Sequence, residues 1–194
     1  PELRVALTAT RAEGEAVVRL RYRQVVDDGW ARADRFPDGL ERDEWDADAL
    51  QIGAWSGTDL VGAMRIVLPA PGRRLPVEVG FGVDVEPAGR VVEAGRLVID
   101  PDFRGDPAHR AWGGLFARAW LELRARGFRV LAGAASPEMV ARLRGVGLPF
   151  EVLGPERPHW GLPRLPVRLD PAESTPTWFA GGLESSGRWS RSPS

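Results

Sequence analysis

Residues 91–100 have the sequence Val-Val-Glu-Ala-Gly-Arg-Leu-Val-Ile-Asp, an almost continuous apolar run interrupted by Glu93, Gly95 and Arg96. Such a run predicts a strand near the centre of a sheet. A charge buried there without a partner is unfavourable, so we expect each of the two charged side chains to have either a partner or a functional role. In a regular strand Glu93 and Arg96 would point to opposite faces. We expect a β-bulge at Gly95 that turns both toward one cleft.

The residues that precede this run predict a strand, a helix and a hairpin. Thr10 and Glu13 have the spacing of a helix capping box. Ser56-Gly57-Thr58-Asp59 is a turn sequence between two apolar stretches, which predicts an antiparallel pair. The expected elements are a strand at 3–7, a helix after residue 10, a loop or broken short helix at 27–48, and strands at 50–55 and 60–68. Residues 69–89 are expected to form an irregular segment that includes an edge strand through 77–81.

The residues that follow predict one strand–helix–strand crossover. Trp112, Phe116 and Trp120 recur at helical spacing, and Gly127 stands where a C-terminal cap is expected. The expected elements are a helix at 112–123, a strand at 130–135, a helix at 137–144 with Ser136 as its N-cap, and strands at 150–153 and 165–169. This order predicts an α/β fold, with a mixed and mostly antiparallel sheet flanked by helices in a single domain at 1–170. Residues 171–194 are rich in Ser, Gly and Pro and are expected to form a flexible tail.

Composition excludes several kinds of chemistry. The chain of 194 residues has 26 basic side chains, all of them Arg, against 27 acidic ones, so a nucleic-acid partner is not expected. It has no Cys, which excludes disulfides, thiolate metal sites and thiol catalysis, and no Lys, which excludes Schiff bases. His109 and His159 have no neighbours at metal-ligand spacing, so we expect no metal site and surface or capping roles for both.

Targeting and cofactor signals are also missing from the sequence. No apolar run approaches the roughly 20 residues that cross a bilayer, and the first residues do not form a signal-peptide pattern. We therefore expect a cytoplasmic protein without integral membrane association. The glycine pairs lack the third glycine of a dinucleotide fingerprint, and there is no Gly-x-Ser-x-Gly elbow, so Rossmann and serine-hydrolase functions are not expected.

Four short motifs together resemble a known family. They are Tyr22-Arg23-x-x-Val26, Glu41-x-Asp43-x-Trp45-Asp46, Arg65 in Met-Arg-Ile-Val-Leu-Pro, and Glu93-Ala-Gly-Arg96-Leu. Their order and rough spacing resemble the acyl-homoserine-lactone synthases and the related N-acyl amino acid synthases, a branch of the GCN5-related N-acetyltransferase (GNAT) fold. The resemblance covers approximately residues 20–170. It implies a GNAT-like fold and an N-acyltransferase that joins a fatty acyl group to the amino group of an amino-acid-like acceptor.

The resemblance also implies a set of site residues. The six charged residues that would line the amine and acyl cleft are Arg23, Asp43, Asp46, Arg65, Glu93 and Arg96. An amine is protonated at neutral pH, so Glu93 is the candidate general base, directly or through an ordered water, and burial is expected to raise its pKa. The alternative for Glu93 is a structural pair with one of the many Arg side chains.

Roles for the other site residues follow from the chemistry of acyl transfer. A backbone N–H at Leu97 or Val98, freed by the bulge, would receive the oxyanion of the attacked thioester. Asp43 and Asp46 would attract a cationic acceptor, unless they belong to a solvated acidic loop. Arg65 and Arg96 would orient the acceptor carboxylate or brace the carboxylates of the site.

The donor site departs from the usual pattern of the fold. Residues 104–115 keep Arg110-x-x-Gly113 but have Leu115 at the last small position, so the pyrophosphate cradle is incomplete. We assign Arg104, Arg110 and Gly113 to the donor site and expect no tightly bound cofactor. An acyl carrier protein (ACP) with a phosphopantetheine thioester is the expected donor and partner, with acyl-CoA as the alternative. The basic residues that would meet this carrier, or would simply be solvated, are Arg104, Arg110, Arg118, Arg124 and Arg126.

Two other functions stay open at the level of sequence. Arg110-x-x-Gly113 and the element order also fit an ordinary acetyl-CoA-dependent N-acetyltransferase. Members of the fold often use a Tyr as an acid near the short C-terminal helix, whereas the only Tyr here is Tyr22. A non-catalytic ligand-binding module of the same fold is therefore the third possibility.

Overall fold

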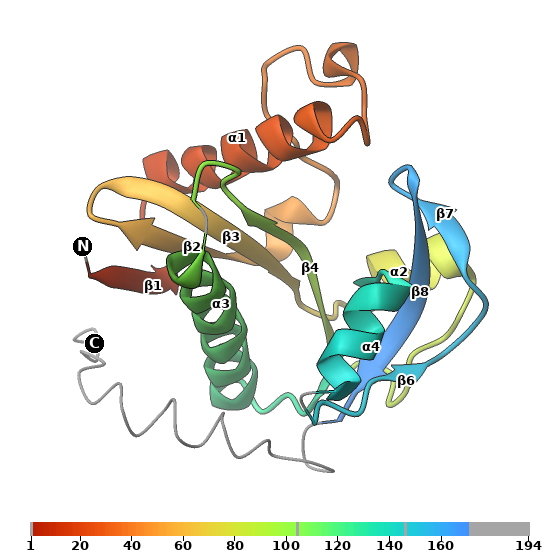
Figure 1. Cartoon of the computed structure of the whole chain (residues 1–194). Helices are drawn as coiled ribbons and strands as arrows, with labels where there is room; N and C mark the ends of the chain where they lie inside the picture. The colour runs from red at the N-terminus through yellow and green to blue at the C-terminus, as the bar shows by residue number, and fades with distance from the viewer. Residues whose placement is uncertain (1, 104, 146, 171–194) are drawn as a thin grey trace.

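The N-terminal half of the sheet is built on the hairpin expected from the turn sequence. The computed structural model describes residues 2–103, 105–145 and 147–170 (Figure 1). The antiparallel strands of this half, in their order across the sheet, are β1 (Leu3–Leu7), β2 (Ala49–Ser56), β3 (Asp59–Val67) and β4 (Val91–Ile99).

The C-terminal half continues the sheet from β4. β5 (Val130–Ala135) pairs with β4 in parallel, and the crossover between them carries a helix, as the sequence predicts. β8 (Leu162–Leu169) then pairs antiparallel with β5, with β6 (Glu151–Val152) and with β7 (Arg157–His159). The result is a mixed eight-stranded sheet.

Helices cover both faces of this sheet (Figure 1). α1 (Arg11–Asp27) and the short α2 (Pro76–Phe81) lie on one face, and α3 (Asp106–Ala125) and α4 (Pro137–Gly145) lie on the other. The connection from α1 to β2 contains two short 3-10 helices, η1 (Ala33–Arg35) and η2 (Asp46–Asp48).

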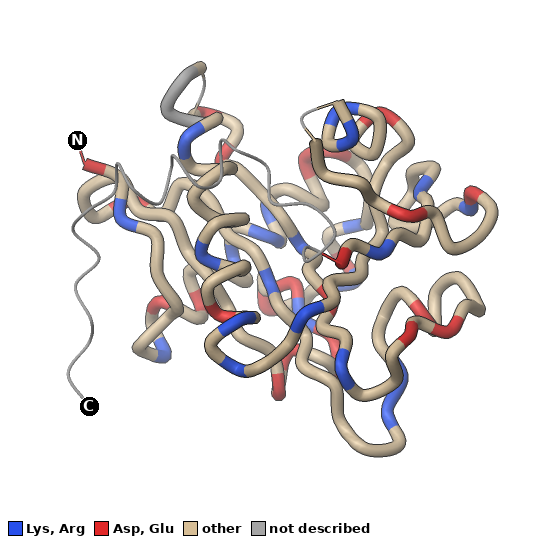
Figure 2. Tube along the Cα trace, turned by 90° about the horizontal axis from the view of Figure 1, so that it is seen from below, with Lys and Arg blue, Asp and Glu red and all other residues tan. Residues whose placement is uncertain are grey.

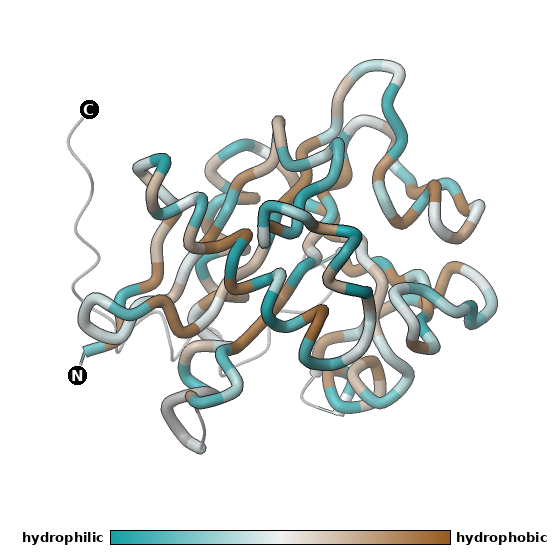
Figure 3. Tube along the Cα trace, turned by 90° about the horizontal axis from the view of Figure 1, so that it is seen from above, coloured by the Kyte–Doolittle hydropathy of each residue, from teal (hydrophilic) through white to brown (hydrophobic). Residues whose placement is uncertain are grey.

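The alternation of side chains along each strand separates the two halves of the core. Met64 and Ile66 on β3 pack with Leu115 of α3, whereas Val67, their neighbour in sequence, packs with Phe81 of α2. Such alternation is expected when a strand is covered on both faces. In Figure 3 the hydrophobic residues concentrate in the segments that run through the interior. β3 is thus buried on both sides.

The pairing of β4 with β5 is short, and this creates an opening in the sheet. Only Val91–Glu93 pair with Val130–Ala132, and the two strands diverge beyond this point. At the point of divergence the backbones come close, because a Cβ on Gly133 would lie 2.6 Å from the carbonyl oxygen of Ala94. The rest of β4 therefore presents an edge that β5 does not cover.

Most of the predicted elements are confirmed. The Thr10 capping box is present, with the Glu13 N–H donating to Oγ1 of Thr10 at 3.1 Å. Gly127 follows α3 with a positive φ of 76°, and Ser136 Oγ accepts the N–H of Met139 at the start of α4. The acidic segment at 27–48 is largely irregular, as expected.

Two expectations about secondary structure are wrong. Residues 77–81 form α2, not an edge strand, because Pro76 stands at the first turn and the Glu78 carboxylate accepts the N–H of Leu75. β7 was not expected at all. The predicted tail at 171–194 lies outside the described residues. No helix within the described ranges is long and apolar enough to cross a bilayer, and the cytoplasmic location stays a prediction.

Candidate active site

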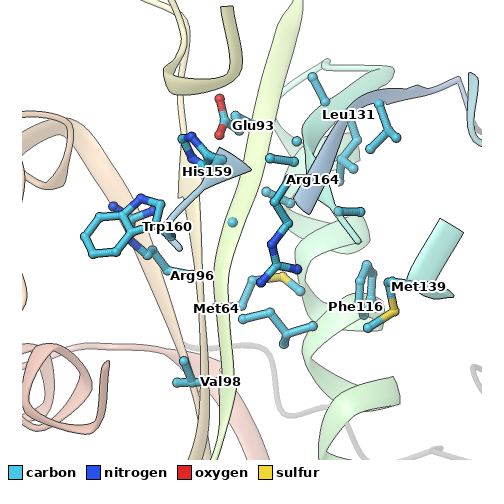
Figure 4. Close-up of a pocket in the computed structure, with 18 of the residues that line it drawn as sticks. Met64, Glu93, Arg96, Val98, Phe116, Leu131, Met139, His159, Trp160 and Arg164 are labelled. Carbon is cyan, nitrogen blue, oxygen red and sulfur yellow. The ribbon is translucent and has the colours of Figure 1, made fainter. Parts of the chain in front are cut away.

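The opening between β4 and β5 contains a pocket with a volume of about 380 Å³ (Figure 4). Its wall on the α3 and α4 face is apolar, and its wall on the α1 and α2 face carries charged and aromatic side chains. The apolar wall includes Met64, Leu97, Phe116, Leu131 and Met139. The polar wall includes Trp30, Glu93, Arg96, His159 and Trp160, and Arg164 lies on the other side of β4 from Arg96, beside Met64, in Figure 4. The pocket thus joins the two faces of the sheet.

Glu93 lies where β4 and β5 separate, and it is one of the lining residues. It is 6% exposed, and its Oε2 accepts the backbone N–H of Val77 at 2.7 Å. No ion pair joins this carboxylate to another described residue. Burial raises the pKa of Glu93 to about 7, although the Val77 N–H and the charges of Arg65 and Arg96 act in the opposite direction. A carboxylate with this pKa exchanges protons at neutral pH.

A β-bulge follows Glu93, as the sequence predicts. Gly95 is opposite Arg65 and Val98 is opposite Ala63, so two residues of β4 face one residue of β3. The strained position is Arg96, whose φ of 51° is rare for a residue with a side chain. Because the bulge shifts the alternation by one residue, Glu93 and Arg96 lie on the same face of the sheet.

Six charged side chains form a closed ring beside the pocket, here named the ion-pair ring. Arginines and carboxylates alternate around it, so its three positive and three negative charges cancel. Arg96 binds Glu41 at 3.1 Å and Asp43 at 2.9 Å, and Arg65 binds Asp43 at 2.5 Å and Asp46 at 3.2 Å. Arg21 closes the ring between Asp46, at 2.7 Å and 3.0 Å, and Glu41. The members in order are Arg21, Glu41, Arg96, Asp43, Arg65 and Asp46.

The ring fixes the ionisation of Asp46 and Arg21. Burial by itself would raise the pKa of Asp46, but Arg21 and Arg65 lower it well below its ordinary value. Burial would likewise lower the pKa of Arg21, yet Asp46 and Glu41 outweigh it and raise that pKa. Asp43 and Asp46 are therefore already neutralised by arginines. Arg65 and Arg96 were expected either to orient the acceptor carboxylate or to brace the carboxylates of the site. Their contacts in the ring correspond to the second role.

The arginine that completes the ring is Arg21, not Arg23. The sequence motif predicts Arg23 in the cleft, but the Arg23 side chain is 51% exposed and binds Asp100 at 3.0 Å, away from the pocket. Arg21 is 0% exposed. The signal that would have found it is helical spacing, because Arg21 lies three residues after Val18 and four before Val25, on the buried face of α1.

The β7–β8 hairpin closes the polar wall. Trp160 and Gly161 form its two-residue turn, with φ of 54° and 70°, the backbone that a tight hairpin requires. The ring of Trp160 lies 4.2 Å from the guanidinium carbon of Arg96. His159 lines the pocket and packs on Phe81 at 5.2 Å. The hairpin therefore adds two aromatic side chains to a site built mainly on β3 and β4.

His159 differs from the sequence expectation of a surface or capping role. Burial lowers its pKa, and the nearby charges of Arg96 and Arg164 lower it further. The imidazole is therefore neutral over most of the physiological range. Nothing in the local sequence marks it as a pocket residue, because the hairpin that carries it was not predicted.

Two of the three predicted donor residues, Arg110 and Gly113, do not line this pocket. Arg104 lies outside the described residues, and Arg110 is exposed on α3. Gly113 has open space around the position of a Cβ. Leu97 and Val98, in contrast, both line the pocket.

The basic patch expected near α3 is partly neutralised. Arg118 and Arg126 both pair with Glu122, and Arg124 lies over Trp120 at 5.8 Å. Basic and acidic residues are interspersed over the view in Figure 2. The four described arginines of the patch have between them the one carboxylate of Glu122, so a net positive charge remains, and a carrier protein as the partner stays a prediction.

Comparison with known proteins identifies the fold. The family model of the acetyltransferase (GNAT) domain matches residues 20–112. A search of curated proteins by sequence finds no match. One similar solved structure is MesI, a CoA-dependent acyl-homoserine lactone synthase, with 22% identity, 97% of each chain covered and a TM-score of 0.75. A second is BjaI, a CoA-dependent acyl-homoserine lactone synthase with SAM and isopentyl-CoA, with 19% identity, 94% of this chain and 89% of that chain covered and a TM-score of 0.73. A third is FeeM, an N-acyl amino acid synthase from uncultured soil microbes, with 18% identity, 89% of this chain and 93% of that chain covered and a TM-score of 0.65. The chain thus has the GNAT fold, which confirms the predicted fold class and the resemblance on which it rested.

Proposed function

We propose that this GNAT-fold chain is an N-acyltransferase that moves a fatty acyl group from a thioester to the amino group of an amino-acid-like acceptor. The observation that carries the proposal is Glu93, a buried carboxylate with a pKa of about 7 in a pocket that joins both faces of the sheet. The similar structures include synthases of this type.

Glu93 is the proposed general base. The acceptor amine is protonated at neutral pH and becomes a nucleophile only when a base removes a proton. Glu93 takes this proton, directly or through a water, while the nitrogen attacks the thioester carbonyl carbon. A C–N bond forms, the C–S bond breaks, and the thiolate leaves with the second proton of the nitrogen as the free thiol. Since a thiolate is a good leaving group, the absence of a Tyr acid near α4 is tolerated.

The backbone of β4 supplies the proposed oxyanion donor. Asp100 donates its N–H to the carbonyl of Val61 at 2.9 Å, and Val98 lies two residues before it in the same ladder with β3. Residues of an antiparallel ladder alternate in direction, so the N–H of Val98 is directed toward β3 and that of Leu97 toward the open edge. Of the two residues expected from the sequence, this register favours Leu97.

The two walls of the pocket suit two different substrates. The apolar wall formed by Met64, Phe116 and Met139 suits an acyl chain, whose burial is favourable in proportion to its area. The polar wall with Glu93 and His159 suits the acceptor. Attack through the opening would then join a chain on the α3 side to a nitrogen on the α1 side.

The donor is proposed to be an acyl group on the phosphopantetheine arm of an ACP, with acyl-CoA as the alternative. The incomplete Arg110-x-x-Gly113 cradle supports the carrier. MesI and BjaI are described as CoA-dependent, which supports the alternative. Both donors therefore belong in the test.

The test is product formation by the purified full chain. Acyl-ACP and acyl-CoA, each with short branched and medium-length chains, are incubated with a panel of the protein amino acids and S-adenosylmethionine. We expect an N-acyl product by mass spectrometry that is absent without protein. Transfer of acetyl groups alone would instead indicate an ordinary N-acetyltransferase. Saturable acyl-donor binding without any product would indicate a non-catalytic module.

A further inference from the structure

Arg164 stands in the pocket and has no carboxylate partner among residues 2–103, 105–145 and 147–170. It comes from β8, is half-buried, and its guanidinium reaches into the opening beside β4 in Figure 4. Its guanidinium carbon lies 5.5 Å from the ring centre of Trp30. The exposed carboxylate of Glu138 acts on it only through space, and no ion pair joins Arg164 to any residue in the described ranges.

The other arginines around the pocket are paired with carboxylates. Arg21, Arg65 and Arg96 each bind two carboxylates of the ion-pair ring. Of their buried side-chain nitrogens, only Nε of Arg65 has no hydrogen-bond partner among the described residues. The charges of all three are thus already balanced by acidic partners. Among the described residues that line the pocket, Arg164 is the arginine without a bound carboxylate.

A half-buried guanidinium in this position favours an anionic ligand. Removing a charge from water is unfavourable unless a counter-charge or hydrogen bonds replace the lost solvation. Stacking on Trp30 replaces only part of it. A carboxylate would complete the site, because the planar guanidinium offers two parallel N–H donors that match its two oxygens.

The chemistry of the two substrates decides which one supplies the anion. The reacting end of an acyl thioester is uncharged, and the phosphates of its carrier are at the opposite end of the pantetheine arm. In an α-amino acid the carboxylate is one carbon away from the nitrogen that must reach Glu93. A cation in the pocket that holds Glu93 therefore matches the acceptor.

We propose that Arg164, stacked on Trp30, binds the carboxylate of the acceptor, so that the enzyme selects α-amino acids over amines that lack this group. The inference rests on the proposed function and deepens it. It replaces Arg65 and Arg96, which the sequence analysis considered for the same task.

The experiment compares the amino acid of the panel that gives most product with its α-carboxamide. We expect wild-type protein to have a KM for the acid about 10- to 100-fold below that for the amide, the effect of a charge-assisted hydrogen-bonded pair. In Arg164→Gln the KM for the acid rises by that factor, the KM for the acyl donor stays within about twofold, and the preference for the acid disappears. Arg164→Lys keeps part of the preference.

The matched control is Arg157→Gln, since Arg157 is the exposed cross-strand partner of Arg164 on the same hairpin and does not line the pocket. It leaves both KM values unchanged. Equal use of acid and amide by the wild-type protein would overturn the inference without any variant. An increase in the donor KM instead of the acceptor KM would overturn it too, by assigning Arg164 to the carrier phosphate.

Calorimetry separates this inference from the proposed function. Without donor, binding of the same amino acid should weaken by the same factor in Arg164→Gln and not in Arg157→Gln. If no acyl donor gives a product with any acceptor, the proposed function fails, and the titration uses each amino acid of the panel to decide whether Arg164 binds a carboxylate. If Arg164→Gln does not fold by circular dichroism, Arg164→Lys and the acid-to-amide ratio of the wild type decide the question.

Discussion

The backbone N–H of Val77 donates a hydrogen bond of 2.7 Å to Oε2 of Glu93, which ties the first turn of α2 to the central strand of the sheet. This bond uses one oxygen of the carboxylate. The other oxygen, Oε1, makes no hydrogen bond to another described residue and is available to a proton. Glu93 is thus held in place by one oxygen while the second is free for chemistry.

Replacing Glu93 by Gln should remove the base and keep the fold. The amide oxygen of Gln can still accept the Val77 N–H, so only proton transfer is lost. We expect acyl transfer to fall about 100- to 10,000-fold, measured as the initial rate of N-acyl product. Glu156→Gln, a substitution of an exposed carboxylate, is the control and keeps the wild-type rate. An unchanged rate in Glu93→Gln would exclude this residue as the base.

The rate should depend on pH through the ionisation of Glu93. Only the carboxylate accepts a proton, and burial raises the pKa of Glu93 to about 7. Below pH 7 we therefore expect kcat/KM to fall about tenfold per pH unit, with a plateau above. The residual rate of Glu93→Gln should lack this break. A wild-type profile that is flat between pH 5 and 8 would contradict the assignment.

The same pKa predicts an effect on stability. Glu93 is raised from an ordinary value of 4.5 to about 7, so the folded protein binds the proton more tightly than the unfolded chain. Its contribution is fully present below pH 4.5 and is lost as the pH rises through 7. Relative to wild type, Glu93→Gln should thus gain up to about 3 kcal/mol of unfolding free energy between pH 4 and pH 8. Urea unfolding at the two pH values measures it, and a difference that does not change with pH would refute it.

Two arginines on one helix should differ sharply in their effect on stability. Arg21→Met leaves Glu41 and Asp46 without their buried partner, which should cost about 3 to 5 kcal/mol. Arg23→Met removes an exposed pair with Asp100 and should cost less than about 1 kcal/mol. Urea midpoints of both variants provide the comparison. Similar losses for both would mean that the ion-pair ring does not hold α1 to the site.

Gly133 should not tolerate a side chain where β4 and β5 separate. A Cβ there would lie 2.6 Å from the carbonyl oxygen of Ala94, and the backbone cannot yield cheaply. Gly133→Ala should lower stability by about 1 to 3 kcal/mol and widen the opening, seen as a changed preference for acyl length. Gly14→Ala is the opposite control, because Gly14 lies in α1 with no atom near a Cβ. It should raise stability by about 0.5 to 1 kcal/mol, and a loss in both variants would point to another cause.

The sequence predicts the elements that depend on local pattern. The capping box at Thr10 and the turn at 56–59 are short-range signals, and both act within a few residues of where they stand. The anomaly of Glu93 and Gly95 in an apolar strand predicts the bulge for the same reason. The edge strand expected at 77–81 is wrong because Pro76 and Glu78 start a helix there, although the apolar residues alternate as they would in a strand.

The site depends on contacts over long distances, and there sequence patterns say less. Arg21 and Arg23 differ by two positions, and only the face of the helix decides which one meets Glu41. Arg164 and His159 belong to a hairpin that was not expected, so their place in the pocket has no local signal. A buried charge can be recognised in the sequence because it interrupts an apolar run, whereas its distant partners carry no such signal.

The short pairing of β4 with β5 also identifies the place where the sheet should begin to separate on unfolding. Three residue pairs form the seam between the N-terminal and C-terminal parts of the sheet, and Glu93 is the last residue on one side of it. A slight separation of β4 from β5 would expose the Glu93 carboxylate to water and lower its pKa to that of a surface glutamate. This would happen before the strands of either part unfolded. Loss of catalysis on warming should therefore precede the loss of secondary structure.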